Sequence, residues 1–541
     1  MVTGPWTDAV RGGSRAPLNR VLGPYLATRR WFRDKSRRIR ATSIADVIEI
    51  PPATGMGGQS PGRLVIVDVQ LDQGLPERYV LTVGHALSEE AAEICKWRPE
   101  SVMCDIRSAD GDGVLYDAVT AAPFVKALVE LMGRRRQLNG TAGRLEPSPT
   151  RTFRRMRDGI TPETPAVPIS AEQSNTSVIV GNQLVVKVIR RLEDGVNPDV
   201  EVSGFLTDVA RFPNAPRLGG SISYATDDDD AAAIVVAQEY VANEGDGWSY
   251  VLDALSRVLA EVITHPSQDE LRIAVSADPL TAAAATPARD HPLVGPHLHW
   301  AEMLGRRTGE LHLALAIDGT DEAFAPEPFT AVDRRSLHHG AKSLLRRSLR
   351  ALRSIPEPSD CVRELLGREA DILARLEATM RRPISARKIR CHGDYHLGQV
   401  LWTGKDFMLI DFEGEPARPL SARRLKRPPL VDVAGMIRSF HYVSRVAGDR
   451  LSRELTLADE RARLDPLTTL WYRSITGVFL RSYLATAGAG GFLPTSDGEL
   501  ADLLDFLLLE KGIYELGYEA DNRPTWVDIP ARGVLDLLGA T

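Results

Sequence analysis

The sequence predicts an α+β fold built from three consecutive parts. Before residue 125, runs such as SIADVIEI and RLVIVDVQL have the alternating or continuous apolar pattern of strands, and a helical pattern closes this part. Farther on, short strand-like runs enclose one helix, and almost everything after 247 has helical spacing except one hairpin near 400–411. We therefore expect a β-rich N-terminal subdomain at 1–125, a small-sheet subdomain at 126–240 and a large α-helical lobe at 241–541.

Composition and charge narrow the class of protein. Of the 541 residues, 43% are hydrophobic and 26% are charged, as in ordinary globular enzymes, and the formal net charge is −6. This charge argues against nucleic acid as a partner, because nucleic-acid binders usually carry a basic surface. We find no apolar run of about 18 residues, no apolar segment of a signal peptide and no disulfide or CxxC spacing among the four cysteines. These features predict a cytoplasmic protein that does not bind membranes.

The densest chemical signal is the segment CHGDYHLGQVLWTGKDFMLIDFE at 391–413. The strand-like runs VLW and FMLI flank the turn TGKD, which is a good hairpin turn. If Trp402 pairs with Phe407, Gln399 and Asp411 lie within one residue of register on neighbouring strands. We therefore expect these two polar side chains to meet.

The residue types in this segment suit phosphoryl transfer. The oxygens of Gln399 and Asp411 are suitable ligands for one Mg²⁺, and Asp394 can accept the proton of an attacking hydroxyl. Each of these residues alone is more simply interpreted as part of a surface hairpin, but the spacing HGDxHxxQ followed by DFE favours the kinase arrangement. His392 and His396 lack a third ligand at zinc spacing, so we expect them to brace the loop.

A kinase catalytic loop predicts an upstream lysine on a strand and a glutamate on the next helix. Lys187 lies among β-branched residues in NQLVVKVI, and Glu201 follows fourteen residues later. Asn197 is a credible N-cap for that helix and Pro198 a favoured first helical residue. We therefore predict a Lys187–Glu201 pair at the ATP phosphates, with a strand-edge lysine and an acid near a helix N-terminus as the alternative interpretations.

The nucleotide site is expected on the strands around this lysine. The strand pair EQSNTSVIVGNQ should cover the ATP phosphates, and because it lacks GxGxxG, side chains such as Ser177 must supply donors. The run AAAIVVAQEYV is expected to lead to an interlobe hinge whose backbone could hold adenine. The predicted ATP-binding residues are Lys187, Glu201, Ser174, Asn175, Thr176, Gln238, Tyr240 and Val241.

Together these motifs resemble those of bacterial maltokinases, a group related to the aminoglycoside phosphotransferases and found with, or fused to, trehalose synthase. The segments that carry the resemblance span nearly the whole chain and include RRWFRDKSRRI, EQSNTSVIV, VVKVIRRLEDGVNPDVEVSGFL, LGRRTGELHLALA, CHGDYHLGQVLW, IDFEGEPARPLSARR and DVAGMIRSFHY. RRWFRDKSRRI and DFEGEPARPL are more specific to maltokinases than HGD, which many small-molecule kinases share. The chain departs from the family at Asp34-Lys35, where a Gly-Lys pair is frequent, and in the Ala/Pro-rich segment 267–292.

The resemblance implies a bilobal eukaryotic-protein-kinase-like fold in which the β-rich part is an N-terminal cap. It implies ATP and Mg²⁺ as cofactors and phosphorylation of maltose at its anomeric hydroxyl, giving maltose 1-phosphate for glycogen and α-glucan synthesis from trehalose. By the same resemblance Asp394 is the catalytic base, Gln399 and Asp411 are the Mg²⁺ ligands, and trehalose synthase is a candidate partner.

The residues of a sugar site are indicated by helical spacing and by position. Arg438 and Tyr442 lie four apart, as do Tyr514 and Tyr518, and aromatic faces suit sugar rings, although core aromatics have the same spacing. The predicted substrate-binding residues are His396, Glu413, Arg438, Tyr442, Tyr514 and Tyr518. Nothing in the sequence separates maltose from glucose, glucosamine or an aminoglycoside as acceptor, and a non-catalytic subunit of trehalose synthase is the alternative from another class.

Overall fold

A computed structural model describes the chain except residues 12, 14–15, 34–36, 56–59, 170–173, 228–229, 265–273, 318–320, 380, 456–457 and 540–541. Parts of RRWFRDKSRRI, EQSNTSVIV and segment 267–292 therefore lie outside the described residues. The chain divides into two compact units. Unit 1 comprises residues 1–209, 216–242 and 416–420, and unit 2 comprises 210–215, 243–415 and 421–541. The boundary predicted at 125/126 falls inside a helix of unit 1, and the three-part division stays a prediction.

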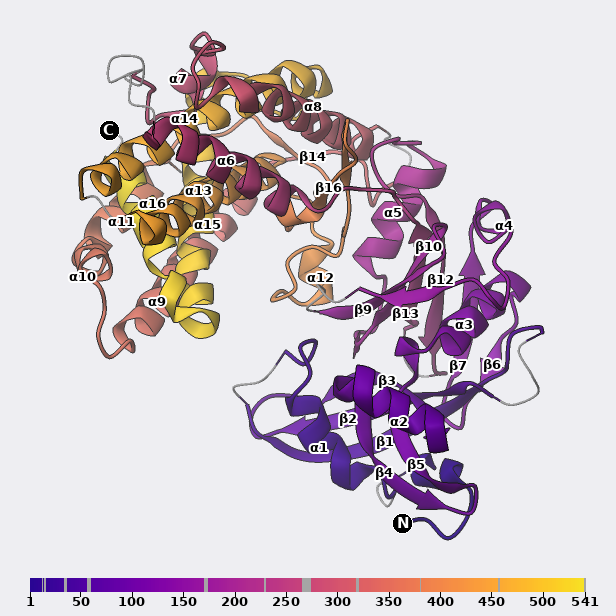
Figure 1. Ribbon diagram of the computed structural model, residues 1–541. Coiled ribbons are helices and arrows are strands. Elements are labelled where there is room, and N and C mark those ends of the chain that lie inside the picture. The colour runs from indigo at the N-terminus through magenta and orange to yellow at the C-terminus, as the bar shows by residue number, and fades with distance from the viewer. Residues whose placement is uncertain are drawn as a thin grey trace. The chain divides into compact units, whose positions relative to one another are not determined.

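Unit 1 begins with a six-stranded antiparallel sheet (Figure 1). Its strands are β1 (Ile39–Ile50), β2 (Gly62–Leu71), β3 (Glu77–Leu87), β5 (Gly111–Asp117) and β4 (Val102–Ser108) in that spatial order, with β11 (Arg191–Leu192) paired to β3. Between and beside them lie η1 (Trp6–Val10), α1 (Asn19–Ala27), α2 (Ser88–Trp97), η2 (Pro99–Ser101) and η3 (Ala118–Thr120). The predicted runs SIADVIEI and RLVIVDVQL are indeed neighbouring strands, paired as Ile44 with Val67 and Val47 with Val65.

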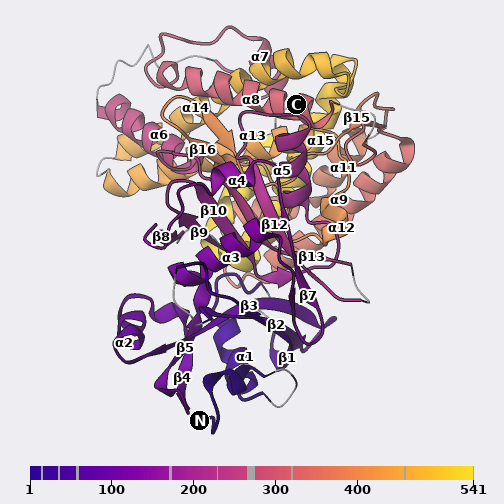
Figure 2. The same ribbon diagram turned by 90° about the vertical axis from the view of Figure 1, so that its right-hand side faces the viewer.

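A second sheet of seven strands completes unit 1. Its order is β6 (Leu138–Asn139), β7 (Arg144–Pro149), β12 (Leu218–Ala225), β13 (Ala232–Glu239), β10 (Leu184–Ile189), β9 (Asn175–Val180) and β8 (Ala166–Pro168). The helices of this region are α3 (Ala122–Arg134), α4 (Phe153–Met156) and α5 (Pro198–Asp208), of which α5 packs beside β12 (Figure 2). The strand β10 lies between β9 and β13, so its central residue Lys187 faces Ser177 on one side and Val236 on the other.

Both sheets of unit 1 contribute to one apolar core. Phe124 and Leu128 of α3 pack there with Ile48 of the first sheet and Val186 of the second. The helix predicted to close the N-terminal part therefore contributes to the core of both sheets.

Unit 2 is mainly helical, as expected. Its helices are α6 (Gly247–Thr264), α7 (Pro279–Ala284), α8 (Leu298–Leu315), α9 (Ala331–Arg353), α10 (Asp360–Gly367), α11 (Glu369–Thr379), α12 (Leu420–Arg423, whose first residue belongs to unit 1), α13 (Leu430–Glu454), α14 (Ala458–Ala487), α15 (Asp497–Asn522) and α16 (Asp528–Gly539). The short 3₁₀ turns are η4 (Gly295–His297), η5 (Leu397–Gln399), η6 (Gly488–Gly490) and η7 (Pro524–Trp526). Besides the predicted hairpin of β16 (Val400–Trp402) and β17 (Phe407–Leu409), unit 2 contains β14 (Glu327–Pro328) paired with β15 (Arg387–Lys388). Strands of two residues leave no periodic pattern in the sequence, which is why this pair was not predicted.

Close helix packing in unit 2 depends on small residues. A Cβ atom on Gly305 of α8 would lie 2.3 Å from the backbone oxygen of Phe479 on α14, so only glycine permits this approach. Large aromatic side chains fill the neighbouring core, where the ring of Phe440 on α13 lies 5.9 Å from Trp300 and 5.3 Å from Phe479. These contacts pack α13 against α8 and α14, and α13 also carries a residue that contacts the loop described below.

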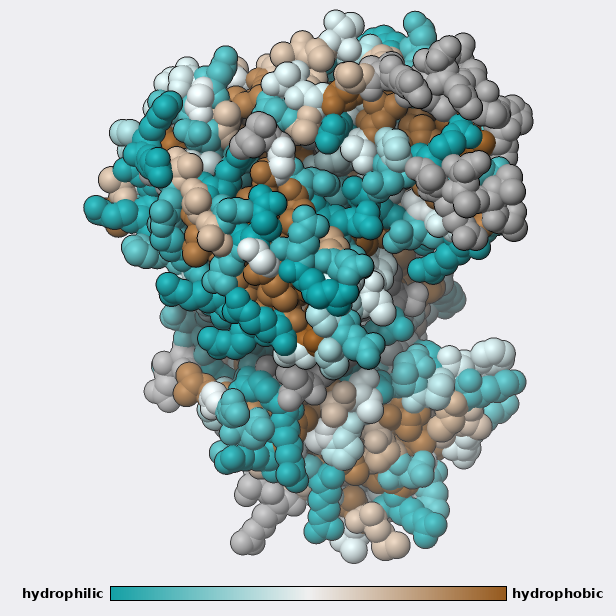
Figure 3. Space-filling model, turned by 90° about the vertical axis from the view of Figure 1, so that its left-hand side faces the viewer, coloured by the Kyte–Doolittle hydropathy of each residue, from teal (hydrophilic) through white to brown (hydrophobic). Residues whose placement is uncertain are grey.

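Hydrophilic side chains cover most of the face that Figure 3 shows, with apolar side chains in smaller groups between them. Among the described residues, no helix combines the length and the apolar character that a membrane crossing requires.

Candidate active site

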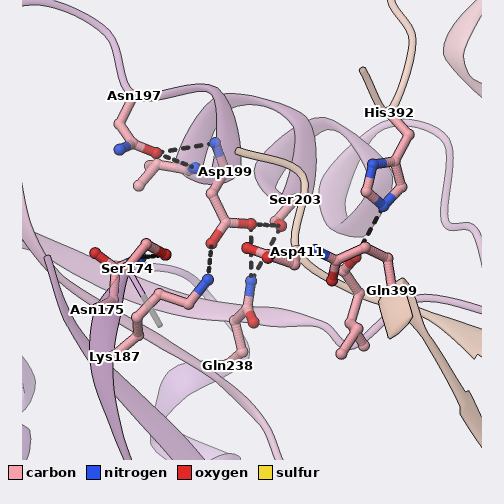
Figure 4. A network of polar contacts seen from close by, with 12 residues as sticks. Ser174, Asn175, Lys187, Asn197, Asp199, Ser203, Gln238, His392, Gln399 and Asp411 are labelled. Carbon is pink, nitrogen blue, oxygen red and sulfur yellow. Dashed lines mark hydrogen bonds and ion pairs between the residues drawn. The ribbon is translucent and has the colours of Figure 1, made fainter. Parts of the chain in front are cut away.

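The hairpin at 400–409 has the predicted register. Trp402 pairs with Phe407 and Val400 with Leu409, and the backbone N–H of Ile410 donates to the carbonyl of Gln399 at 3.0 Å. The side chains of Gln399 and Asp411 consequently meet, with Gln399 Nε2 donating to Asp411 Oδ2 at 2.9 Å (Figure 4). The expected juxtaposition of these two residues is confirmed.

Asp411 has an unusual backbone conformation. Its φ of +67° lies in the left-handed region that residues other than glycine rarely adopt, and such strain tends to occur at functional sites. The neighbouring backbone is held by His392, whose Nε2 lies 2.9 Å from the carbonyl oxygen of Ile410 and whose ring packs against Phe412. His392 therefore braces the loop, as the sequence predicted, and it does so at the residue that precedes Asp411.

The donors around Asp411 suit a magnesium ion. Gln399 and Asp411 offer an amide oxygen and a carboxylate, which are the hard oxygen ligands that Mg²⁺ prefers. In the observed hydrogen bond Gln399 directs its amide nitrogen to Asp411, and a half-turn of the amide would direct Oε1 to the same place. Glu413, two residues beyond Asp411, is buried and adds a carboxylate to this part of unit 2.

Asp394 lies on the loop before the hairpin. Its carboxylate has two cationic or polar neighbours within unit 2, with Oδ1 3.5 Å from Lys511 Nζ and Oδ2 3.9 Å from His396 Nε2. His396 Nδ1 accepts a hydrogen bond from the backbone N–H of Gly398, and burial lowers the pKa of His396. The imidazole is thus neutral with its proton on Nε2, toward Asp394, and the described contacts give it a positioning role in the loop.

A buried hydrogen-bond network centred on Asp432 holds the backbone of the loop at the two residues before Asp394. Asp432 on α13 accepts the backbone N–H of His392 at 2.8 Å and of Gly393 at 2.9 Å, and it also contacts His312 Nε2 at 3.0 Å. The other ring nitrogen of His312 lies 3.0 Å from the hydroxyl of Tyr483. Burial alone would raise the pKa of Asp432, but His312 and the backbone donors outweigh it and hold that pKa below its ordinary value.

Asp432 and His312 were not predicted as site residues. They lie in DVAGMIRSFHY and LGRRTGELHLALA, segments that contributed to the resemblance without a role for either residue. A buried carboxylate that accepts two N–H groups fixes the direction of the loop, so these are positioning residues.

Lys511 forms the centre of a second polar group around Asp394. Its Nζ lies 3.5 Å from Asp394 Oδ1 and 3.5 Å from Glu415 Oε2, and it sits 4.9 Å from the ring centre of Tyr514. Tyr514 in turn donates its hydroxyl proton to Glu415 Oε1 at 2.6 Å, and its ring stacks on Tyr518. Of the predicted sugar-site tyrosines, Tyr514 therefore lies in the group that surrounds Asp394.

Lys511 and Glu415 are further residues that sequence reasoning missed. Both lie beside predicted residues, Lys511 one helical turn before Tyr514 and Glu415 two residues after Glu413. Helical spacing was the available signal for Lys511, since residues three apart share a helix face.

Arg438 and Tyr442 lie elsewhere. Arg438 is 2% exposed and forms an ion pair with Glu515 at 2.7 Å, and Tyr442 is 8% exposed and donates to Glu519 at 3.1 Å. Their face of α13 packs against α15, the helix that carries Lys511 and Tyr514. The sugar contact predicted for Arg438 and Tyr442 stays a prediction, and the contacts described here give them a role in holding α15.

In unit 1, Lys187 contacts an acidic residue in the first turn of α5. Its Nζ lies 3.2 Å from Asp199 Oδ2, and both side chains are enclosed, at 7% and 0% exposed (Figure 4). Asp199 Oδ1 also accepts from Ser203 Oγ and from Gln238 Nε2, each at 3.3 Å. Asp199 is therefore the acidic residue that the structure shows in contact with Lys187.

The start of α5 explains why Asp199 meets Lys187. Asn197 caps the helix by accepting the N–H of Asp199 at 2.9 Å, and Pro198 is the first helical residue, as predicted. Two residues along a helix correspond to a turn of about 200°, so Asp199 and Glu201 point in nearly opposite directions. The predicted cap is confirmed, and the Lys187–Glu201 pair stays a prediction beside the observed contact of Lys187 with Asp199.

The other predicted ATP-binding residues lie on or beside the second sheet. Ser174 Oγ accepts from Asn175 Nδ2 at 3.3 Å, and Thr176 Oγ1 accepts from Arg190, a fully buried arginine that also pairs with Asp117. At the end of β13, the backbone N–H of Tyr240 donates to the carbonyl of Gln183 at 2.9 Å, and Val241 follows it. Thr176 and the backbone N–H of Tyr240 thus have hydrogen-bond partners within unit 1. That the predicted ATP-binding residues contact the nucleotide stays a proposal.

Comparison with known proteins places this geometry in a family. Residues 166–467 match the model of the phosphotransferase enzyme family. A glucosamine kinase of Mycolicibacterium smegmatis is 26% identical over 384 residues, which are 69% of this chain and 79% of that protein. A glucosamine kinase of Streptacidiphilus jiangxiensis is 28% identical over 386 residues, or 70% and 75% of the two chains.

Solved structures of glucosamine kinase have the same fold. One crystal form has a TM-score of 0.62 at 20% identity, and a complex with glucosamine, ADP and inorganic phosphate has a TM-score of 0.60 at 19% identity. Each comparison covers 97% of this chain and 100% of the other. The predicted α+β, bilobal, protein-kinase-like fold is thereby confirmed. Because the family match spans more than half of the sequence, the chain belongs to the phosphotransferase enzyme family.

Proposed function

We propose that this protein transfers the γ-phosphoryl group of ATP to a hydroxyl group of a sugar. The observation that carries the proposal is the hairpin that brings Gln399 and Asp411 together beyond a loop whose backbone, at the two residues before Asp394, is hydrogen-bonded to Asp432. The glucosamine kinases among its relatives support a sugar acceptor, and the structural relative with bound ADP supports a nucleotide donor.

The proposed mechanism assigns each residue a separate task. Asp394 orients the sugar hydroxyl and accepts its proton as the new O–P bond forms and the bond between the γ-phosphorus and the bridging oxygen of ADP breaks. Gln399 and Asp411 would hold Mg²⁺, which neutralises phosphate charge when bound. Lys187, oriented by Asp199, would bind the phosphates of the nucleotide from unit 1.

Maltose is the acceptor that we propose first, phosphorylated at its anomeric hydroxyl. The segments RRWFRDKSRRI and DFEGEPARPL favour it by their resemblance to maltokinases, although residues 34–36 of the first lie outside the described residues. Tyr518, whose ring stacks on Tyr514 at 6.2 Å between centres and which is 40% exposed, offers an aromatic face that suits a sugar ring. In this proposal maltose 1-phosphate supplies α-glucan and glycogen synthesis, and trehalose synthase is a candidate partner.

Glucosamine is the second candidate. It is favoured by the two relatives that are glucosamine kinases, at 26% and 28% identity over about two thirds of the chain. Because Asp394 would serve as base for either sugar, the base does not distinguish the two acceptors.

A panel of acceptors tests the proposal. ADP release from Mg·ATP is measured with maltose, glucose, glucosamine, trehalose and an aminoglycoside, using the wild type, Asp394→Asn and Asp253→Asn. Asp253 is an exposed residue of α6 and serves as the matched control. We expect maltose-dependent release that Asp394→Asn abolishes and Asp253→Asn retains. Release with glucosamine alone would favour the second candidate, and absence of release with every sugar would contradict the proposed function.

A further inference from the structure

Lys511 places a fixed positive charge beside the proposed base. Its side chain is 26% exposed and is therefore accessible to solvent. Its Nζ lies 3.5 Å from a carboxylate oxygen of Asp394 and 3.5 Å from one of Glu415. An acceptor whose hydroxyl meets Asp394 must therefore place its neighbouring substituents close to this ammonium group.

The charge on Lys511 is well stabilised. Burial by itself would favour the neutral amine, but Asp394, Glu415 and Glu515 together outweigh burial and raise the pKa of Lys511 above its ordinary value. Lys511 is therefore cationic throughout the neutral pH range.

The position of this charge is also fixed. Tyr514 donates to one oxygen of Glu415 while the other oxygen faces Lys511, so both oxygens of that carboxylate have partners. Lys511 in turn contacts the ring of Tyr514 at 4.9 Å, a favourable cation–π distance. The ammonium group is thus held by Asp394, Glu415 and an aromatic ring at once.

We infer that Lys511 is a specificity-determining residue that admits neutral sugars and rejects sugars carrying an ammonium group. A sugar hydroxyl can accept a hydrogen bond from the lysine, whereas an ammonium group can only donate and is repelled. The two carboxylates that would otherwise attract a cationic sugar are already paired with Lys511. This inference rests on the proposed function, in which Asp394 meets the acceptor.

The test compares two sugars that differ at one position. Glucose and glucosamine carry a hydroxyl and an amino group at C2, so the ratio of their kcat/KM values isolates the effect of charge. The variants are Lys511→Met, which removes the charge, Lys511→Arg, which keeps it, and Lys405→Met, which makes the same substitution at an exposed lysine of the hairpin turn. Thermal unfolding of each variant verifies that it is folded.

We expect the wild type and Lys405→Met to prefer glucose, and Lys511→Met to shift the ratio toward glucosamine by about tenfold or more, which corresponds to about 1.4 kcal/mol. Lys511→Arg should retain most of the preference for glucose. An unchanged ratio in folded Lys511→Met, or a wild type that prefers glucosamine, would overturn the inference while leaving kinase activity intact.

A second measurement needs only the wild type, and it applies if Lys511→Met does not fold. Glucosamine and glucose are compared as inhibitors of the reaction with maltose, and the inference predicts weaker inhibition by glucosamine. Equal or stronger inhibition by glucosamine would overturn it. Absence of ADP release with every sugar tested would contradict the proposed function itself, so the two failures are distinguishable.

Discussion

The polar pair Gln399–Asp411 is brought together by a hairpin, whereas the pair Lys187–Asp199 is brought together by the packing of a helix on a sheet. At the hairpin the predicted side chains meet at 2.9 Å. At the strand–helix site Lys187 contacts Asp199 at 3.2 Å, two residues before the acid that was predicted.

The difference shows which geometry a sequence specifies locally. In a hairpin the turn determines the register, so two residues that flank it are placed without reference to the rest of the fold. A helix cap determines where a helix begins, but the packing of the helix decides which of its faces meets the sheet. Asp199 and Glu201 both lie in the first turn of α5, and the buried face of α5 includes Asp199 and Ser203.

Replacement of Asp394, the proposed base on the loop before the hairpin, should lower kcat more than any other substitution proposed here. We expect Asp394→Asn to lower kcat by about 10²- to 10⁴-fold, because the variant cannot accept the hydroxyl proton. Nucleotide binding, measured by calorimetry with ADP, should remain close to the wild type. Turnover at the wild-type rate would show that another group is the base.

Substitutions of the two acids of α5 test the contact between the strand and the helix. Asp199→Asn removes a carboxylate that contacts the buried ammonium group of Lys187, so we expect the free energy of unfolding to fall by about 3 kcal/mol and the KM for ATP to rise. Glu201→Gln, on the same helical turn, tests the pairing predicted from the sequence and should have a much smaller effect on both. Urea unfolding and ATP titration measure these effects, and a larger effect at Glu201 would restore the original pairing.

Asp432 offers a pH-dependent test of the loop. Its carboxylate has a lowered pKa in the folded state, so its contribution to stability is present above its unfolded value, about 3.9, and is lost as pH falls through the folded value. We expect Asp432→Asn to reduce stability by about 2 kcal/mol at pH 7, because a charged acceptor of two N–H groups becomes neutral. The difference from the wild type, measured by urea unfolding, should shrink below about pH 4. A difference that stays constant with pH would argue against this assignment.

Removal of the second proposed metal ligand has a smaller expected effect. Asp411→Ala should raise the Mg²⁺ concentration needed for half-maximal activity by about tenfold or more, since Gln399 would be left without its carboxylate neighbour. A magnesium titration at saturating ATP measures this change. Unchanged magnesium dependence would contradict the ligand role.

The order of elements was largely predictable, since apolar periodicity is a local property of the chain. The strands β1, β2 and β10, the Asn197 cap and the β16–β17 hairpin were found where the pattern placed them. The positive φ of Asp411 was not foreseen, because a positive φ is expected from the sequence mainly at glycine and this residue is an aspartate.

The residues that were missed depend on contacts between distant parts of the chain. Asp432 contacts the N–H groups of residues about forty positions earlier, and His312 lies 120 positions before Asp432. Arg438 and Tyr442 have the helical spacing of a ligand-facing pair, yet their face of α13 packs on α15. Helical spacing identifies the residues that share a face, and only tertiary packing decides what that face meets.

If Asp394 and the hairpin beyond it serve the phosphorylation of a sugar, the product of the reaction is a sugar phosphate. The wild type is incubated with Mg·ATP and maltose, and the products are observed by ³¹P NMR. The proposal predicts a new sugar-phosphate resonance, assigned to the anomeric position, that grows in proportion to ADP and is absent with Asp394→Asn. The proposal would be contradicted if ADP formed together with inorganic phosphate alone, and if parallel samples with glucose and with glucosamine also gave no phosphorylated sugar.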